Sequence, residues 1–147
     1  MFSKILFPTD GSEFAQARLG KAVELAKHFN ASLVVFHALP RYHYPLHLDM
    51  TPFSFPTREE FDAQSRARAQ HALDAVSQAA AQAGVSCSTR TMAEVPAAEA
   101  IVQAAQDEGC DLICMASHGQ SGFSGAFLGS NATKVLTHTS LPVFVLR

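Results

Sequence analysis

Short apolar runs alternate along the whole chain with longer segments of helical periodicity. The runs that indicate strands cover residues 4–9, 31–39, 85–92, 111–117 and 141–147. Four of them contain an unbroken apolar stretch, KILF, LVVF, LICM or VFVL, which is typical of parallel strands covered on both faces. The run at 85–92 alternates apolar and polar residues instead. We therefore expect it at an edge of the sheet.

The segments between these runs repeat apolar residues every three or four positions, as amphipathic helices do. They predict helices over residues 12–29, 57–83, 96–109 and 130–138. Ser12 is a candidate N-cap for the first helix, and Thr57 with Glu60 matches a capping box at the start of the second. Gly84 and Gly109 are placed to end the second and third helices.

This order of strands and helices, with right-handed crossovers, predicts a doubly wound α/β fold. We expect a single five-stranded parallel sheet of order 3-2-1-4-5 with helices on both faces. A chain of 147 residues fits one domain, over residues 1–147. Residues 40–56 are irregular and rich in proline and aromatic residues, which makes them a candidate lid or contact loop.

Composition narrows the functional classes. Hydrophobic residues make up 48% of the chain and charged residues 16%, which argues against disorder and against a nucleic-acid partner. The formal charge is -2, so any phosphate binding has to come from local backbone geometry. The three cysteines form no C-x-x-C pair and indicate reduced thiols. With no secretory signal or membrane-spanning run in the sequence, we expect a cytoplasmic protein with no membrane partner.

Ligands of open parallel sheets bind at the carboxyl ends of the strands. Pro8, Thr9 and Asp10 follow the first strand, and His37 and Ala38 end the second. Asp10 either contacts a ligand or caps the following helix together with Ser12, and both roles are compatible. His37 ends a buried strand, where we expect a hydrogen-bonded core histidine.

The stretch after the fourth strand is the most informative. Half of the chain's eight glycines, at 119, 122, 125 and 129, lie here and are followed by Ser130 and Asn131 at a helix start. Glycines permit close backbone approach and a helix N-terminus offers free N–H donors, so such a loop can bind phosphate without a basic field. No lysine lies between Gly119 and Ser130, which excludes a Walker A loop. The loop is also not a dinucleotide-binding fingerprint, because that motif follows the first strand and this loop follows the fourth.

The whole chain resembles the universal stress protein (UspA-like) family. The resemblance is carried by KILFPTDGSEFA, HALP, DLICMASHG, LGSNATKVL and LPVFVLR, in that order and spacing. Nucleotide-binding members carry G-x-x-G, nine residues, then G-[ST]. The matching positions are Ala116, Gly119, Gly129 and Ser130, so the spacing is kept while alanine replaces the first glycine. The methyl group of Ala116 is costly only if that position needs a left-handed backbone or a close approach of the ligand.

The resemblance implies a regulatory protein of the stress response that binds ATP or AMP, with or without Mg²⁺, and turns it over slowly or not at all. Pro8, Thr9 and Asp10 would line the nucleoside end, and the backbone of Ala38 would touch the adenine edge. The ribose and phosphates would be bound by Ala116, Ser117, His118, Gly119, Gly129, Ser130 and Asn131.

Two alternatives stay open. A slow ATP-hydrolysing enzyme would need a base and a cation clamp, for which the strand ends supply only Asp10, His118 and the more distant Lys134. A dimeric scaffold without nucleotide would follow if Ala116 prevents binding. The resemblance also implies a homodimer through the apolar last strand, Val143 to Leu146, which would otherwise be an exposed edge.

Overall fold

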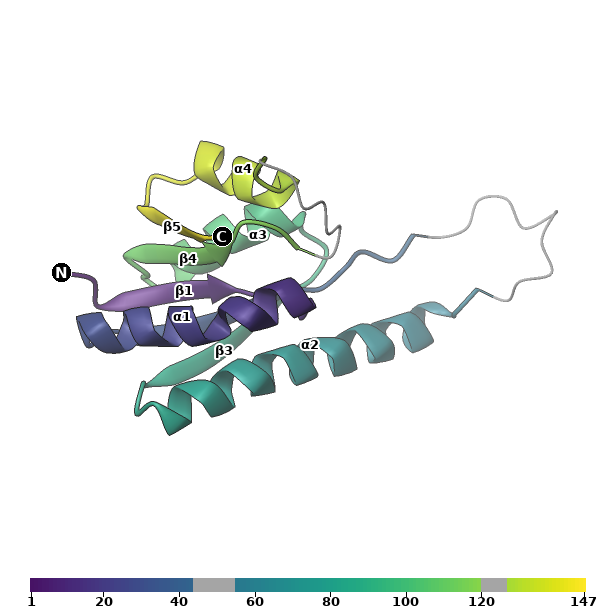
Figure 1. The fold of residues 1–147 in the computed structure, drawn as a ribbon. Helices are drawn as coiled ribbons and strands as arrows, with labels where there is room; N and C mark the ends of the chain where they lie inside the picture. Colours follow the sequence, from purple (N-terminus) through teal and green to yellow (C-terminus); the bar gives the residue numbers. More distant parts are fainter. Residues whose placement is uncertain (44–54, 120–126) are drawn as a thin grey trace.

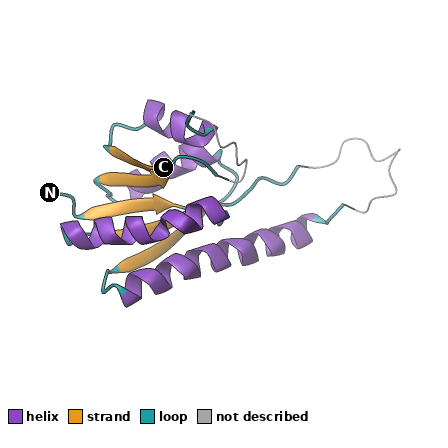
Figure 2. Ribbon diagram, viewed as in Figure 1, coloured by secondary structure: helices purple, strands orange, loops and turns teal. Residues whose placement is uncertain are grey.

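The computed structural model describes residues 1–43, 55–119 and 127–147 (Figure 1). Strands and helices alternate along these residues, as Figure 2 shows. The elements are β1 (Lys4–Pro8), α1 (Glu13–Phe29), β2 (Ser32–Ala38), α2 (Arg58–Gln82), β3 (Cys87–Met92), α3 (Ala97–Asp107), β4 (Leu112–Ala116), α4 (Ser130–His138) and β5 (Val143–Leu146).

The five strands form one parallel sheet of order β3-β2-β1-β4-β5, which confirms the predicted doubly wound topology. The polar run at Cys87–Met92 is an edge strand, as its alternation predicted. Since all strands run the same way, the carboxyl ends of β2, β1 and β4 lie side by side at one edge of the sheet. Figure 1 shows this for β1 and β4.

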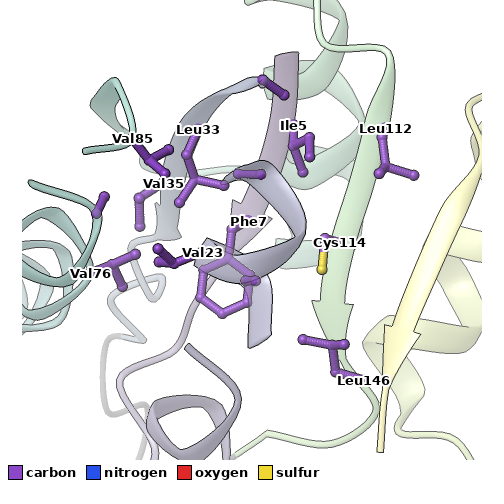
Figure 3. Close-up of a cluster of buried hydrophobic side chains, with 14 of the residues drawn as sticks. Ile5, Phe7, Val23, Leu33, Val35, Val76, Val85, Leu112, Cys114 and Leu146 are labelled. Atoms are coloured by element: carbon purple, nitrogen blue, oxygen red, sulfur yellow. The ribbon is translucent and has the colours of Figure 1, made fainter. Parts of the chain in front are cut away.

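Two hydrophobic cores explain the unbroken apolar runs. Alternate residues of a strand point to opposite faces, so a strand covered on both sides is apolar at every position. Ile5 and Phe7 of β1 pack on the face covered by α1 and α2, with Val23 and Val76 among their neighbours (Figure 3). Leu6 belongs to the other core, under α3 and α4.

The helix ends follow local sequence signals. The Ser12 hydroxyl accepts a hydrogen bond from the Ala15 N–H at 3.2 Å, and Thr57 with Glu60 forms both bonds of a capping box. Gly84 and Gly109 have φ of +72° and +65°, the left-handed conformation in which glycine commonly ends a helix. Pro96 differs slightly from the prediction, since it is the N-cap of α3 and precedes the first turn.

The last strand departs from the prediction that all four apolar runs are covered on both faces. Phe144 in β5 is 50% exposed. The reason is topological, because within the described part of the chain β5 is the second edge of the sheet and pairs only with β4. Of the candidate lid at 40–56, residues 44–54 lie outside the described residues. Among the described residues, no helix is long and apolar enough to cross a membrane.

Candidate functional site

Three residues singled out from the sequence lie at neighbouring strand ends. Pro8 ends β1, Ala38 ends β2 and Ala116 ends β4. Beyond Pro8 the ladder continues for one more bond, in which the Thr9 N–H donates to the Phe36 carbonyl at 2.8 Å. The fold therefore brings these positions, which are distant in sequence, to one edge of the sheet.

Asp10 combines both roles considered for it at the sequence level. Its Oδ1 accepts a hydrogen bond from the Ser12 N–H at 3.0 Å, so it shapes the turn that leads into α1. Its Oδ2 lies against Gly119, so closely that a Cβ added to Gly119 would overlap it. Asp10 thus connects the end of β1 to the start of the loop that follows β4.

The far end of the glycine-rich loop is fixed to the end of β4. The Gly129 N–H donates to the Ser117 carbonyl at 2.8 Å, and the Ser117 N–H donates to the Leu146 carbonyl at 2.8 Å. A Cβ on Gly129 would lie 3.0 Å from the Ser117 carbonyl oxygen and 3.4 Å from the Cα of His118. A side chain at 129 would therefore require the backbone of Ser117 and His118 to give by a few tenths of an ångström, which favours glycine before any ligand is considered.

The N-terminus of α4 differs from those of α1 and α2. Its N-cap is Gly129, which has no side chain, and none of the described residues forms a side-chain cap bond there. The first N–H groups of a helix have no acceptor within the helix. The N–H of Gly129 is already bonded to Ser117, so the donors left for an anion are those that follow, at Ser130 and Asn131. Helix N-termini of this kind attract phosphate and carboxylate groups.

Ala116 has ordinary strand geometry. Among the described residues, the only non-glycine residues with positive φ are Asn30 and Glu94. Ala116 pairs with Leu146 across the sheet and is buried. One of the two conditions that would make its methyl group costly, a left-handed backbone, is therefore not met.

His118 is oriented by its neighbours. Its Nδ1 shares a hydrogen bond of 2.9 Å with the Ser117 hydroxyl, and its ring packs edge-on against Phe14, with 5.5 Å between the ring centroids. The guanidinium of Arg18 stacks on the same Phe14 ring, 3.5 Å from its centroid. These contacts hold the imidazole at the start of the loop, beside α1.

The prediction that His37 is a fully hydrogen-bonded core histidine is wrong in one respect. The residue is buried, 8% exposed, but its Nδ1 has no hydrogen-bond partner among the described residues. Burial lowers the pKa of His37, while a hydrogen bond to the Thr9 backbone and the charge of Asp10 act in the opposite direction. The imidazole is consequently neutral near pH 7.

A cavity of about 390 Å³ lies between the β1–α1 turn and α2. Arg68 and His71 of α2 line it, together with Asp10 and Gly11. Sequence reasoning missed Arg68 and His71, because both occupy exposed helical positions of ordinary composition. Only the packing of α2 beside the β1–α1 turn places them here. Within the described residues, no group of three or more His, Cys, Asp or Glu side chains could hold a metal ion.

Comparison with known proteins agrees with this architecture. A model of the universal stress protein family matches residues 1–147. A universal stress protein of Thermus aquaticus is 33% identical over 147 residues, covering 100% of both chains. The universal stress protein YxiE of Bacillus subtilis is 30% identical over 150 residues, again covering 100% of both.

Solved structures agree as well. A universal stress protein family structure from Burkholderia pseudomallei superposes with a TM-score of 0.77 at 26% identity, over 98% of this chain and 95% of that one. More distant structures share the fold. A universal stress protein of Archaeoglobus fulgidus in complex with dAMP superposes with a TM-score of 0.67 at 18% identity, over 99% of this chain and 98% of that one. An Arabidopsis thaliana family protein with AMP bound superposes with a TM-score of 0.66 at 14% identity, over 98% of this chain and 90% of that one. The chain belongs to the universal stress protein family.

Proposed function

We propose that this protein binds an adenine nucleotide, AMP or ATP, at the carboxyl ends of β2, β1 and β4, and that the bound state regulates a partner. One observation carries the proposal. The N-terminus of α4, whose N-cap is Gly129, is held beside the end of β4 by the bond from Gly129 to Ser117, and the Asp10 carboxylate lies at the other end of the same loop.

The phosphate end of the site relies on the backbone. The N–H groups of Ser130 and Asn131 and the dipole of α4 favour an anion, and the Ser130 hydroxyl can add one further hydrogen bond. A net charge of -2 supplies no general attraction for phosphate, so binding by main-chain donors is the mode this chain supports.

The nucleoside end relies on Asp10 and the strand ends. A carboxylate accepts hydrogen bonds from ribose hydroxyl groups or from an exocyclic amino group. Pro8, Ala38 and Ala116 end the neighbouring strands β1, β2 and β4, and Thr9 follows Pro8. Family members of the same fold have been solved with AMP and with dAMP, which supports an adenine nucleotide as the ligand class here.

Rapid hydrolysis is not part of the proposal. A general base must reach the attacking water, and a cation must neutralise charge on the transferred phosphoryl group. Of the candidate bases, Asp10 uses Oδ1 on the Ser12 N–H and His118 shares its Nδ1 with the Ser117 hydroxyl. Both arrangements favour binding and positioning, with turnover slow or absent.

Titration calorimetry with AMP and with ATP, each with and without Mg²⁺, tests the proposal. Freshly purified protein is first precipitated with acid, and any nucleotide released is identified. We expect binding of at least one nucleotide, weakened severalfold by Ser130→Ala. The substitution Ser140→Ala, at an exposed serine beyond α4, is the matched control and leaves affinity unchanged.

The same experiment distinguishes the alternatives. No heat with either nucleotide, and no nucleotide released on precipitation, would contradict the proposal and favour the dimeric scaffold. Steady phosphate release that is lost in His118→Ala or Asp10→Asn would instead favour a slow ATP-hydrolysing enzyme.

A further inference from the structure

His37 is a buried titratable side chain at the edge of the sheet where the nucleotide is proposed to bind. It lies one residue before the end of β2 and is 8% exposed. Leu33 and Val35 of the same strand belong to the core under α1 and α2, and strand alternation directs His37 to that face. Its Nδ1 has no hydrogen-bond partner among the described residues. Buried polar atoms of this kind are rare, so this nitrogen is a candidate for a functional role.

The other ring nitrogen shows which form of the imidazole is present. The backbone of Thr9 forms a hydrogen bond with His37 that favours the protonated ring, so the ring is the donor. The Thr9 N–H itself donates to the Phe36 carbonyl at 2.8 Å, which leaves the Thr9 carbonyl as the acceptor. Since Nδ1 has no partner, the donor is Nε2. The neutral ring therefore carries its proton on Nε2, and the lone pair of Nδ1 is where a second proton binds.

Asp10 is the charged group that responds to a proton on His37. The ionisable side chains of the elements packed on this face are Asp10 after β1, Glu13 at the start of α1, and Arg68 and His71 on α2. Opposite His37 in the register with β3 lies Thr91, which carries no charge. Burial lowers the pKa of His37, and the charge of Asp10 acts in the opposite direction. The carboxylate and the imidazole are thus close enough to be coupled.

The Asp10 carboxylate also makes contacts within the proposed site. Its Oδ1 accepts a hydrogen bond from the Ser12 N–H at 3.0 Å, and its Oδ2 lies where a Cβ on Gly119 would stand. Because the carboxylate is the end of a flexible side chain, it can move without a shift of the backbone. Movement of this one group would therefore change the β1–α1 turn, the start of the loop after β4 and the nucleoside end together.

We propose that acid releases the nucleotide from this site, with His37 as the proton sensor. A proton from solvent binds Nδ1, and the resulting N–H has no acceptor among the described residues in its buried position. The Asp10 carboxylate turns to accept this N–H in a charge-assisted hydrogen bond and leaves Gly119 and the nucleoside end. The nucleotide loses its carboxylate partner and dissociates. The inference rests on the proposed nucleotide binding and adds its regulation by pH.

The direction of the effect follows from linkage between the proton and the nucleotide. Burial lowers the pKa of His37 below 6.5, so the free protein takes up this proton only below that pH. A nucleotide that engages Asp10 opposes the uptake and lowers the pKa further. By reciprocity, the proton weakens nucleotide binding by the same factor. A difference of about one pH unit between the free and bound proteins corresponds to about a tenfold loss of affinity.

Calorimetry with AMP between about pH 7.5 and about pH 5 tests the proposal. The phosphate of AMP titrates in the same range, so the wild type and each variant are compared at every pH. We expect the wild type to lose about tenfold more affinity than His37→Gln across this range. Asp10→Asn cannot form the charged pair, so it should bind more weakly throughout and show the small pH dependence of His37→Gln. His138→Gln, at an exposed histidine in the last turn of α4, is the control and should match the wild type.

A second measurement does not depend on whether His37→Gln folds. Nuclear magnetic resonance of the wild-type protein, with the His37 ring signals assigned through the backbone, gives the midpoint of its titration directly. We expect a midpoint below 6.5 without nucleotide, and a lower one with saturating AMP. Asp10→Asn without nucleotide should also lower the midpoint, because the charge that favours the protonated ring is removed.

The outcomes separate this inference from the proposed function. Equal pH dependence of AMP affinity in the wild type, His37→Gln and Asp10→Asn would overturn the proton sensor and leave nucleotide binding intact. A His37 midpoint that AMP does not move would do the same. PH dependence that persists in His37→Gln and disappears in His118→Gln or His71→Gln would overturn it too, since another histidine would be the sensor. Absence of AMP binding by the wild type at neutral pH would overturn both proposals.

Discussion

The carboxylate oxygen Oδ2 of Asp10 lies where a Cβ on Gly119 would stand, so a side chain at position 119 requires the Asp10 carboxylate to move. This contact joins the turn after β1 to the loop after β4. The position of Asp10 explains why glycine is favoured at 119, because the backbone of Gly119 is not left-handed.

This contact predicts that Gly119→Ala displaces the Asp10 carboxylate and is less costly when Asp10 is shortened. Because the displaced group is the end of a flexible side chain, we expect a cost of about 1 kcal/mol of the free energy of unfolding, at the low end of overpacking effects. In the Asp10→Ala background the same substitution should cost much less, a coupling that denaturant unfolding of the four proteins measures. Gly20→Ala is the control, because Gly20 lies in α1 with nothing within 4 Å of a Cβ, and it should be neutral or stabilising. If the effects of Gly119→Ala and Asp10→Ala on the free energy of unfolding were additive, the result would contradict the contact.

The buried His37 predicts a pH dependence of stability. Burial lowers its pKa below the ordinary value of 6.5, so the unfolded chain takes up the proton first as the pH falls. The contribution of neutral His37 is therefore complete above 6.5 and is lost progressively as the pH falls from there through the lower pKa of the folded state. Urea unfolding across this range should show a weaker pH dependence in His37→Gln. His138→Gln, at an exposed histidine, is the control and should retain the wild-type profile. If the free energy of unfolding changed with pH by the same amount in all three proteins, the prediction would be wrong.

The three cysteines are expected to differ in reactivity. Burial raises the pKa of Cys114 to about 12 and that of Cys110 to about 11, and it also raises the pKa of the half-buried Cys87. Since the thiolate is the reactive form, iodoacetamide at mildly alkaline pH should label Cys87 first. Cys110 and Cys114 should react only after unfolding, as mass spectrometry of timed samples would show. Labelling of Cys114 as fast as Cys87 in the folded protein would contradict their burial.

We propose that two copies of the chain associate through β5. Val143–Leu146 forms an edge strand, and its Phe144 is 50% exposed. Phe144→Asp should therefore yield a monomer in sedimentation velocity without a large loss of stability. Val145 is a poorer site for the charge, because it is half-buried opposite Met115 and the change would also disturb folding.

Phe55→Asp is the matched control for this association, since Phe55 is 51% exposed and lies outside β5. It should leave the sedimentation coefficient of the dimer unchanged. A wild-type protein that stays monomeric at high concentration would end the proposal, as would a Phe144→Asp variant that still dimerises.

Local sequence signals were sufficient to predict the strands, the helices and their order. A capping box such as Thr57 with Glu60 involves residues within one helical turn, and an apolar run such as LVVF reports burial of the strand that contains it. With parallel strands and right-handed crossovers, that order left few topologies, and the observed one was predicted. The resemblance likewise depended on short motifs at fixed spacing, and the family match over residues 1–147 confirms it.

Tertiary structure alone decided which of those residues meet. The contact of Asp10 with Gly119, the bond from Gly129 to Ser117 and the position of Arg68 all join segments that are far apart in the chain. The sequence pattern likewise does not show that one nitrogen of His37 has no partner among the described residues, or that an apolar run such as VFVL forms an edge strand. The physical reason is that periodicity and caps record interactions within a turn or a strand, whereas a site is formed by distances between elements, which exist only once the sheet has assembled.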